Sequence, residues 1–295
     1  RFLPGCRAAG VAVEELDPAW LLRQEPGLAR NVVRAFGVPD GVLDAVRLVR
    51  ACAASGISCG ARIVTGRSLT ALRQDGGRVV GATLDGGGIV EAEVVVNAAG
   101  AWAGSVAATA GCRVPARLSK GVMVAVAGRL VHAVVSRCRL PADGDIMVPF
   151  GASTMGPSTI MGTTDVPVTD PDDGEAGDDG VRAMTAAGEE LVPGFSSVGP
   201  VRAWAAVRPL VGDQAPGSGA RQVSRSHRVI DHSEHDGVAG LITVTGGKAT
   251  TFRLMAEEAV DAVCVALGSP RPCRTAVEAL PRADAAPGVA GILLG

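Results

Sequence analysis

The order of strand-rich and helix-rich stretches constrains this fold more than any other feature of the sequence. Residues 41–111 and 236–268 each combine strand-like apolar runs with an amphipathic helix pattern. Between them, residues 112–235 contain mostly short strand-like runs separated by turn residues. A chain that leaves one pattern and later returns to it indicates two interleaved domains. We therefore expect an α/β fold in which a mainly antiparallel domain is inserted into a domain of strands flanked by helices.

This interleaving is typical of a cofactor domain with a substrate domain inserted into it. Apolar residues make up 47% of the chain and charged residues 20%, which is enough to build a core and rules out disorder for most of the length. The expected divisions are residues 1–40 as a substrate or cap region, 41–111 as the first part of the cofactor domain, 112–235 as the substrate domain, 236–268 as the return of the cofactor domain, and 269–295 as a linker.

Local patterns predict several elements. Asp17 followed by Pro18 is typical of an N-cap with proline at the first helical position. Residues 62–65 predict a short strand, and the turn at residues 75–77 predicts a hairpin. The acidic, glycine-rich stretch 170–180 is expected to be a solvated loop.

Charge and residue usage exclude several classes of function. The chain has 28 basic and 30 acidic residues and no tyrosine, so it offers neither a basic field nor a stacking platform for nucleic acid. Its apolar runs fall far short of the ~20 residues that a membrane span needs, so any membrane contact would be peripheral. Seven scattered cysteines without a C-x-x-C pair argue against a disulfide framework or a zinc site. We expect a cytoplasmic protein, with peripheral contact at the inner face of the cell membrane as a further option.

The first candidate site follows an apolar strand, residues 241–245, which runs into Gly246, Gly247 and Lys248 and then into a helix. Glycines let a ligand approach the backbone, and a helix N-terminus directs free N–H groups at an anion. Lys248 adds a positive charge, Ala249 is small, and Thr250 and Thr251 add hydroxyls. This pattern predicts a site for a phosphate or for the charge on a reduced flavin; a glycine turn with an ordinary helix cap remains the alternative.

Two weaker signals accompany it. Asn97, Ala98, Ala99 and Gly100, with Trp102 just beyond, follow a buried strand, and small residues at a strand's carboxyl end suit a nucleotide; close packing of a helix on the strand needs the same residues. Arg208 precedes a proline, which holds it extended, and its guanidinium could bind phosphate. A surface arginine is the alternative.

The histidines give little indication of catalysis. His232 and His235 have a spacing that suits a metal, but no further ligand is evident, so a polar turn is favoured and no metal is predicted. His132 lies in an apolar stretch and is expected to be packed. The chain contains no G-x-S-x-G, H-E-x-x-H, P-loop or G-x-G-x-x-G motif.

Taken in order, the motifs resemble FAD-dependent glycerol-3-phosphate dehydrogenase, most closely the A subunit of the anaerobic enzyme. The resemblance covers nearly the whole chain, and part of it is shared with the wider amino-acid-oxidase-like flavoproteins. The matching segments are Phe36–Gly41, Val94–Gly100, Ser119–Gly121, Ser136–Asp143, Ile160–Asp165, Ala206–Val211, Thr245–Cys264 and Arg271–Thr275.

The resemblance implies a partial FAD-binding, Rossmann-like domain and oxidation of sn-glycerol 3-phosphate to dihydroxyacetone phosphate, with electrons passed to a quinone-linked acceptor through electron-transfer and membrane-anchor subunits. It implies that Arg208, Lys248 and Thr250 hold the substrate. It also implies that FAD lies along Asn97, Ala98, Ala99, Gly100 and Trp102, with its ring at Gly246, Gly247, Lys248, Ala249 and Thr250. It assigns no general base.

The sequence also departs from the family. The N-terminal G-x-G-x-x-G segment and the C-terminal cysteine-bearing, iron-sulfur-type domain are not in this chain, so we expect a fragment that is inactive alone. Two alternatives stay open: an amino-acid-oxidase-like flavoenzyme acting on an amine or a 2-hydroxy acid, and a non-catalytic remnant.

Overall fold

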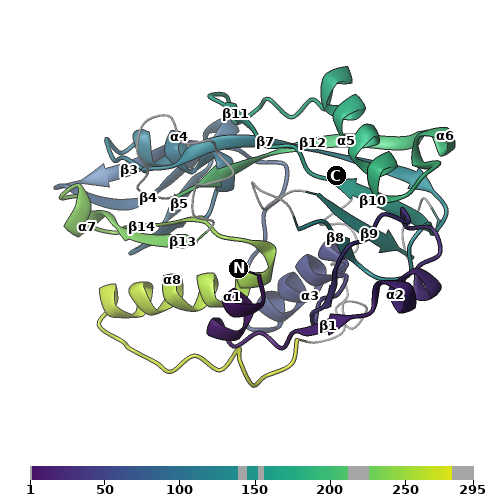
Figure 1. The fold of residues 1–295 in the computed structure, drawn as a ribbon. Helices are drawn as coiled ribbons and strands as arrows, with labels where there is room; N and C mark the ends of the chain where they lie inside the picture. The colour runs from purple at the N-terminus through teal and green to yellow at the C-terminus, as the bar shows by residue number, and fades with distance from the viewer. Residues whose placement is uncertain (1, 139–144, 152–155, 212–225, 281–295) are drawn as a thin grey trace. The chain divides into compact units, whose positions relative to one another are not determined.

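The computed structural model describes residues 2–138, 145–151, 156–211 and 226–280, and its contacts divide the chain into two compact units (Figure 1). Unit 1 comprises residues 1–44, 120–166 and 172–206, and unit 2 comprises residues 45–119, 167–171 and 207–295. The chain thus enters each unit more than once. Four stretches of the expected antiparallel domain, residues 112–119, 167–171, 207–211 and 226–235, lie in unit 2 instead. The last of them does so because the strand at residues 227–231 pairs with the strand at 241–246.

Unit 1 is built on an antiparallel sheet. Its strand order is β11-β7-β10-β9-β8, with β12 pairing β7, and β7, β11 and β12 have residues in both units. The strands are β7 (Arg117–Ala127), β8 (Val135–Ser136), β9 (Ile146–Phe150), β10 (Ser158–Gly162), β11 (Val166–Val168) and β12 (Pro200–Leu210). The remaining elements are α1 (Phe2–Ala8), β1 (Glu14–Leu16), α2 (Pro18–Gln24), β2 (Ala35–Gly37), α5 (Gly177–Leu191) and α6 (Phe195–Val198).

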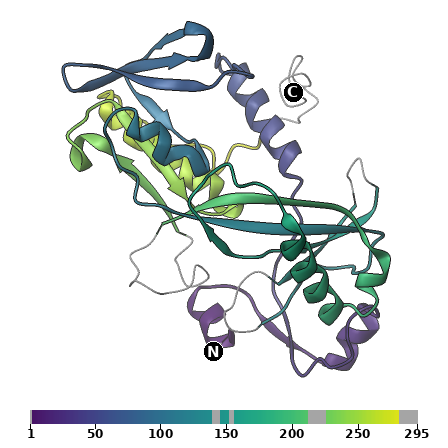
Figure 2. The same cartoon turned by 90° about the horizontal axis from the view of Figure 1, so that it is seen from above.

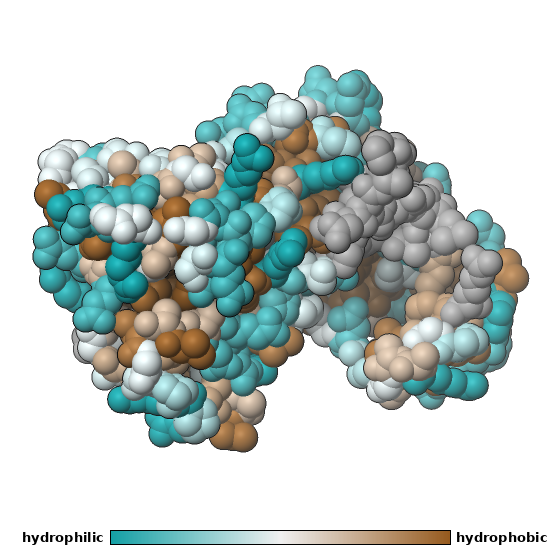
Figure 3. Space-filling view, turned by 90° about the vertical axis from the view of Figure 1, so that its left-hand side faces the viewer, coloured by the Kyte–Doolittle hydropathy of each residue, from teal (hydrophilic) through white to brown (hydrophobic). Residues whose placement is uncertain are grey.

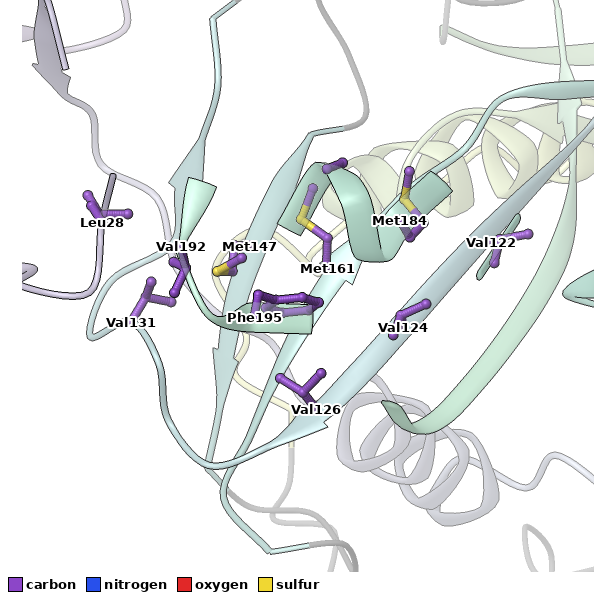
Figure 4. Packing of buried hydrophobic residues seen from close by; sticks show 11 residues of the cluster. Leu28, Val122, Val124, Val126, Val131, Met147, Met161, Met184, Val192 and Phe195 are labelled. Carbon is purple, nitrogen blue, oxygen red and sulfur yellow. The ribbon is translucent and has the colours of Figure 1, made fainter. Parts of the chain in front are cut away.

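The core of unit 1 lies between this sheet and helices α5 and α6 (Figure 4). Alternate residues of β7 point into it, because successive side chains of a strand face opposite sides. They meet Met184 on α5 and the fully buried Phe195 on α6. Gly188 lets the ring of Phe195 approach α5, since a Cβ at residue 188 would lie 2.5 Å from that ring. The buried members are Leu28, Val122, Val124, Val126, Val131, Met147, Met161, Met184, Ala187, Val192 and Phe195.

Two local predictions need correction and one is confirmed. Helix α2 begins as predicted, with Asp17 accepting a hydrogen bond from the backbone N–H of Ala19. The expected loop at residues 170–180 is shorter than predicted, because α5 already begins at Gly177, with two aspartates in its first turn, where the helix dipole favours negative charge. Residues 62–65 form no strand: within the described chain this stretch has no ladder partner.

Unit 2 combines two three-stranded sheets with helices. One is the meander β3-β4-β5, in which Gly76 and Gly77 take positive φ and form the predicted hairpin turn. The other has the order β13-β14-β6, with α8 packed along β13 and β14 (Figure 2). The elements are α3 (Ala45–Ser58), β3 (Leu69–Asp75), β4 (Arg78–Leu84), η1 (Asp85–Gly87), β5 (Ile89–Glu91), β6 (Val95–Asn97), η2 (Gly100–Trp102), α4 (Ala103–Ala108), β13 (His227–Asp231), α7 (His232–His235), β14 (Leu241–Gly246), η4 (Ala249–Thr251) and α8 (Phe252–Ala266).

Several large apolar side chains of unit 2 remain at the surface. Val46 and Val49 on α3 and Val260 and Val265 on α8 are each at least half exposed. On the face drawn in Figure 3, hydrophobic residues lie in small groups among hydrophilic ones. Among the described residues, no helix combines the length and the apolar character that crossing a membrane would require.

Candidate functional site

Two parallel strands of unit 2 end at the same edge of their sheet. β6 pairs with β14 in parallel, and Asn97, the last residue of β6, lies opposite Thr243. β14 continues for three more residues, to Gly246, which carries it roughly 10 Å further in the same direction. In α/β sheets, ligands bind beyond the carboxyl ends of such strands. The structure therefore brings the two sequence-predicted cofactor segments, residues 97–102 and 246–250, to one side of the sheet.

Asn97 shapes the turn after β6 through its side chain. The residue is 4% exposed, and its amide nitrogen donates hydrogen bonds to the carbonyl oxygen of Ala103 (2.8 Å) and to Oγ1 of Thr243 (3.2 Å). Its amide oxygen accepts from the backbone N–H of Ala99 (3.3 Å). Gly100 takes a positive φ of 56°. The buried side chain of Asn97 thus fixes the turn by hydrogen bonds. The two small residues Ala98 and Gly100 are exposed on its outer side.

The turn after β14 is fixed mainly by contacts within the protein. Gly246 and Gly247 have φ values of 76° and 79°, a conformation that favours glycine. A Cβ on Gly246 would lie 2.6 Å from the carbonyl oxygen of Ser226, and one on Gly247 would lie 2.3 Å from Sδ of Met255. Both glycines are therefore required by the fold, whatever a ligand demands.

The long helix α8 does not start directly after the two glycines. A turn of 3-10 helix, η4, precedes α8, and Oγ1 of Thr251 accepts from the backbone N–H of Lys248 (3.1 Å) and donates to its carbonyl oxygen (2.9 Å). One hydroxyl that the sequence offered to an anion is therefore used inside the protein. Lys248, Ala249 and Thr250 are all exposed. The positive charge and the remaining hydroxyl are accessible to a ligand.

Arg208 lies on β12, whose end reaches the Gly-Gly-Lys turn. A Cβ on Gly246 would lie 2.9 Å from Cγ2 of Val211, three residues after Arg208. Arg208 is half-buried. Within unit 2, the end of β12 that carries Arg208 therefore lies against the turn that carries Lys248. That the two side chains bind one ligand stays a prediction.

A chain of buried hydrogen bonds, which the sequence did not reveal, lies behind the turn at Asn97. His232 is fully buried, with Nε2 2.8 Å from Oγ1 of Thr243 and Nδ1 2.5 Å from Oδ2 of Asp236. His235 also contacts Oδ2 of Asp236, at 3.0 Å. The hydrogen bond from His232 is the main cause that holds the pKa of Asp236 below its ordinary value. The expected polar turn at 232–235 is instead the short helix α7, and its first histidine faces the core.

The same cluster contains three side chains of metal-ligating type. Ligand atoms of Cys112, His232 and Asp236 lie within 4.8 Å of one another. Both ring nitrogens of His232 already have protein partners, however, and burial together with the charge of Asp236 raises the pKa of the Cys112 thiol. Metal binding needs the thiolate, so the geometry favours a polar core over a metal centre.

Unit 1 contains a second polar feature beside a cavity of about 460 Å³. Glu25 is 3% exposed and accepts hydrogen bonds from the backbone N–H groups of His132 (2.7 Å) and Ala133 (2.6 Å). The side chain of His132 is 64% exposed, so its predicted packing was wrong. Its neighbours Leu130 and Val131 do pack into the core of unit 1, but the ring of His132 points outward and only its backbone N–H and one ring nitrogen contact Glu25. The cavity is lined by Asp40, Gly41, Val42, Asp44, Arg129, His132, Ala133, Val134, Pro149, Phe150 and Gly151.

Comparison with known proteins gives consistent similarities. The chain is 39% identical to the A1 subunit of anaerobic glycerol-3-phosphate dehydrogenase from Haloferax volcanii, over 96% of this chain and 50% of the relative. It is 38% identical to the A subunit of anaerobic glycerol-3-phosphate dehydrogenase from Escherichia coli, over 95% and 52%. The structure of glycine oxidase from Geobacillus kaustophilus matches with a TM-score of 0.70 and 25% identity, over 94% of this chain and 69% of that one. The chain spans about half the length of the curated relatives it matches.

The two-unit fold and these similarities define the class as a flavin-dependent oxidoreductase with a Rossmann-like cofactor domain. Among structures with this fold is a glycerol-3-phosphate dehydrogenase from Bacillus halodurans complexed with FAD, with a TM-score of 0.70 and 24% identity, over 90% of this chain and 54% of that one. The chain belongs to the DAO family of FAD dependent oxidoreductases, whose family model matches residues 2–261.

Proposed function

We propose that this chain forms the FAD- and substrate-binding part of an enzyme that oxidises sn-glycerol 3-phosphate at C2 to dihydroxyacetone phosphate. The observation that carries the proposal is the meeting of three segments in unit 2: the turn after β6, the Gly-Gly-Lys turn after β14, and the end of β12. The similarity to two proteins named as subunits of anaerobic glycerol-3-phosphate dehydrogenase supports the choice of substrate.

The residues at this edge fit a dinucleotide cofactor. The exposed Ala98 and Gly100 leave the backbone open after β6, and the exposed Lys248 supplies positive charge after β14. Asn97, Ala98, Ala99, Gly100 and Trp102, which is 47% exposed, would lie along the adenosine and pyrophosphate half of FAD. Gly246, Gly247, Ala249 and the start of the following helix would face the flavin ring.

The proposed chemistry divides between cofactor and chain. When bound, FAD would supply a two-electron acceptor for the hydride from C2, and the C2 hydroxyl would give up its proton, so that the ketone forms. The chain would orient the substrate: Arg208 and Lys248 would bind the phosphate by charge, and Thr250 would add a hydrogen bond. Lys248 would also favour negative charge that develops nearby during the transfer.

The partners follow from the same proposal. Both glycerol-3-phosphate dehydrogenase relatives compared above are named as subunits. We expect electron-transfer and membrane-anchor subunits that pass electrons to a quinone-linked acceptor. The protein would then be cytoplasmic and peripheral at the inner face of the cell membrane.

A second candidate is an amino-acid-oxidase-like activity on an amine or a 2-hydroxy acid. The similarity to glycine oxidase supports it, since Arg208 could bind a carboxylate as well as a phosphate. The exposed Lys248 next to Thr250 favours the phosphate, because two cationic groups suit its higher charge.

Flavin reduction tests the proposal. The protein, with all flanking sequence that its gene encodes, is purified, loaded with FAD and mixed with glycerol 3-phosphate without oxygen; loss of the visible flavin absorbance is expected. Bleaching by glycine or a 2-hydroxy acid alone would establish the second candidate. A protein that binds no FAD would be a remnant.

Arg208 provides the sharper test, with a matched control. Arg208→Gln should keep the flavin spectrum but raise the substrate concentration for half-maximal bleaching on the order of 10- to 100-fold, because a charged hydrogen bond is lost. Arg228→Gln, on an exposed residue of β13 in the same unit, should leave it unchanged. Equal effects of the two variants would refute the role of Arg208.

A further inference from the structure

The buried hydrogen-bond chain behind Asn97 contains residues to which the proposed function assigns no role. It runs from Asn97 through Thr243 and His232 to Asp236, and it joins β6, β14 and α7. Asn97, Thr243 and His232 are each at most 4% exposed. Partners inside a protein must be matched donor to acceptor, because an unmatched buried polar group is costly. The direction of each hydrogen bond can therefore be worked out.

The directions follow from the amide of Asn97. Its nitrogen can only donate, so the oxygen of Thr243 accepts from it. The single hydroxyl hydrogen of Thr243 is then available to Nε2 of His232. That nitrogen must carry no proton, so the ring proton lies on Nδ1 and is donated to Asp236. This tautomer is assigned from the hydrogen-bond network, and it gives every member of the chain a partner.

Each member of the chain orients the next. The amide of Asn97 can hold the backbone of Ala99 and Ala103 only while its plane is fixed, and Thr243 contributes to fixing it. The hydroxyl of Thr243 points correctly only while Nε2 of His232 is an acceptor. Asp236 keeps it so by accepting a hydrogen bond from Nδ1–H, which holds the ring proton on that nitrogen.

We propose that His232 and Thr243 are positioning residues that hold the turn after β6 in the shape that binds FAD. They act through Asn97, and the inference rests on the proposed function, since it assigns their effect to flavin affinity. The chain of donors and acceptors gives His232 two separable roles: an acceptor toward Thr243 and a donor toward Asp236. Only the first is directed at the turn.

Two substitutions separate these roles. In His232→Gln, the side-chain oxygen can take the place of Nε2 and accept from Thr243. In His232→Asn, the amide can take the place of Nδ1 and donate to Asp236, which leaves Thr243 without an acceptor. Asp236 tolerates the loss of His232 better, because His235 and the backbone N–H of Arg113 also bond to it.

The dissociation constant of FAD is measured for each variant of the whole protein, below the unfolding transition of all of them. His232→Asn should weaken FAD binding about three- to tenfold, the loss of one hydrogen bond, and His232→Gln by less than about twofold. An equal loss in both variants would overturn the inference. Wild-type protein without FAD affinity would overturn the proposed function instead, so the two failures are distinguishable.

A second pair keeps the test valid if a histidine variant does not fold. Thr243→Val removes the hydroxyl and should weaken FAD binding as His232→Asn does, whereas Thr243→Ser should bind nearly as wild type. The matched control is Thr159→Val in unit 1, where an equally buried threonine makes two hydrogen bonds, accepting from the backbone N–H of Leu130 and donating to the carbonyl of Gly128. It should lower stability without changing the affinity for FAD. If Thr159→Val and Thr243→Val weaken FAD binding equally, His232 and Thr243 are merely structural.

Discussion

Alanine at Gly246 and at Gly247 should have unequal effects, although the chemical change is the same. Both residues have nearly equal positive φ, so an alanine suffers the same backbone strain at either position. The surroundings differ. At residue 246 the new methyl group would meet a backbone carbonyl oxygen, that of Ser226, at 2.6 Å. At residue 247 it would meet the thioether end of Met255, a flexible side chain, at 2.3 Å.

These contacts set the expected magnitudes. The left-handed conformation costs an ordinary residue about 1–2 kcal/mol. Overpacking adds about 1–3 kcal/mol where the surroundings cannot move. Gly246→Ala should therefore lower the free energy of unfolding by about 2–5 kcal/mol, since the β13–β14 pairing holds the chain next to Ser226 in place. Gly247→Ala should lower it by only about 1–3 kcal/mol, because Met255 can turn away.

Urea unfolding of the protein without added FAD, followed by circular dichroism, measures both values apart from any ligand effect. Met255→Ala provides the internal control: combined with Gly247→Ala it should recover the part of the loss that is due to the clash, and combined with Gly246→Ala it should recover nothing. Equal losses for the two glycines, or recovery of both by Met255→Ala, would refute the assignment of these contacts.

Three further predictions concern other charged or buried groups. Glu25→Ala removes the buried carboxylate that accepts from the backbone N–H groups of His132 and Ala133. Because two hydrogen bonds to a charged group are lost, it should lower the free energy of unfolding by about 3–5 kcal/mol, against about 1–2 for Glu25→Gln in the same urea titration; similar losses would contradict it. Burial raises the pKa of Cys112, so iodoacetamide should label it far more slowly than the exposed Cys52 until the protein is unfolded, as mass spectrometry would show. Hydrogen bonds from two backbone N–H groups hold the pKa of Glu189 below its ordinary value. The ionised Glu189 side chain therefore contributes its full stabilisation above the unfolded pKa of about 4.3. That contribution is lost as the pH falls through the lower pKa of the folded protein. In Glu189→Gln, the free energy of unfolding, measured by urea titration at a series of pH values, should therefore fall less steeply toward acid pH than in the wild type. Equal slopes for the two proteins would argue against this.

The sequence predicted those parts of the fold that depend on local chemistry. The N-cap at Asp17 needs only a carboxylate followed by a proline, and the hairpin at Gly76 needs only glycines that accept positive φ. The strand before Gly246 could be found because a continuous apolar run ends abruptly at two glycines. Residues 62–65 were misread because β-propensity alone does not supply a partner strand.

The candidate site was predictable in its segments and not in its internal contacts. The small residues after Asn97 and the Gly-Gly-Lys turn carry a local signature, but their meeting depends on the parallel pairing of β6 with β14, which joins residues far apart in the chain. The hydrogen bond between His232 and Thr243 depends on the same sheet. His232 read as a surface turn because the sequence around it is polar. Only the fold directs its ring inward.

The turn after β14 contains two kinds of residue: glycines that the fold requires, and exposed residues that a ligand could contact. Gly246 and Gly247 are fixed by their own backbone and neighbours, so a change there disturbs the scaffold before it alters recognition. The next three residues, Lys248, Ala249 and Thr250, are exposed. Selection or design can therefore vary charge, size and hydrogen bonding at these three positions with little structural penalty. In the substrate site proposed above, a few substitutions at these positions would change substrate preference while the architecture is preserved.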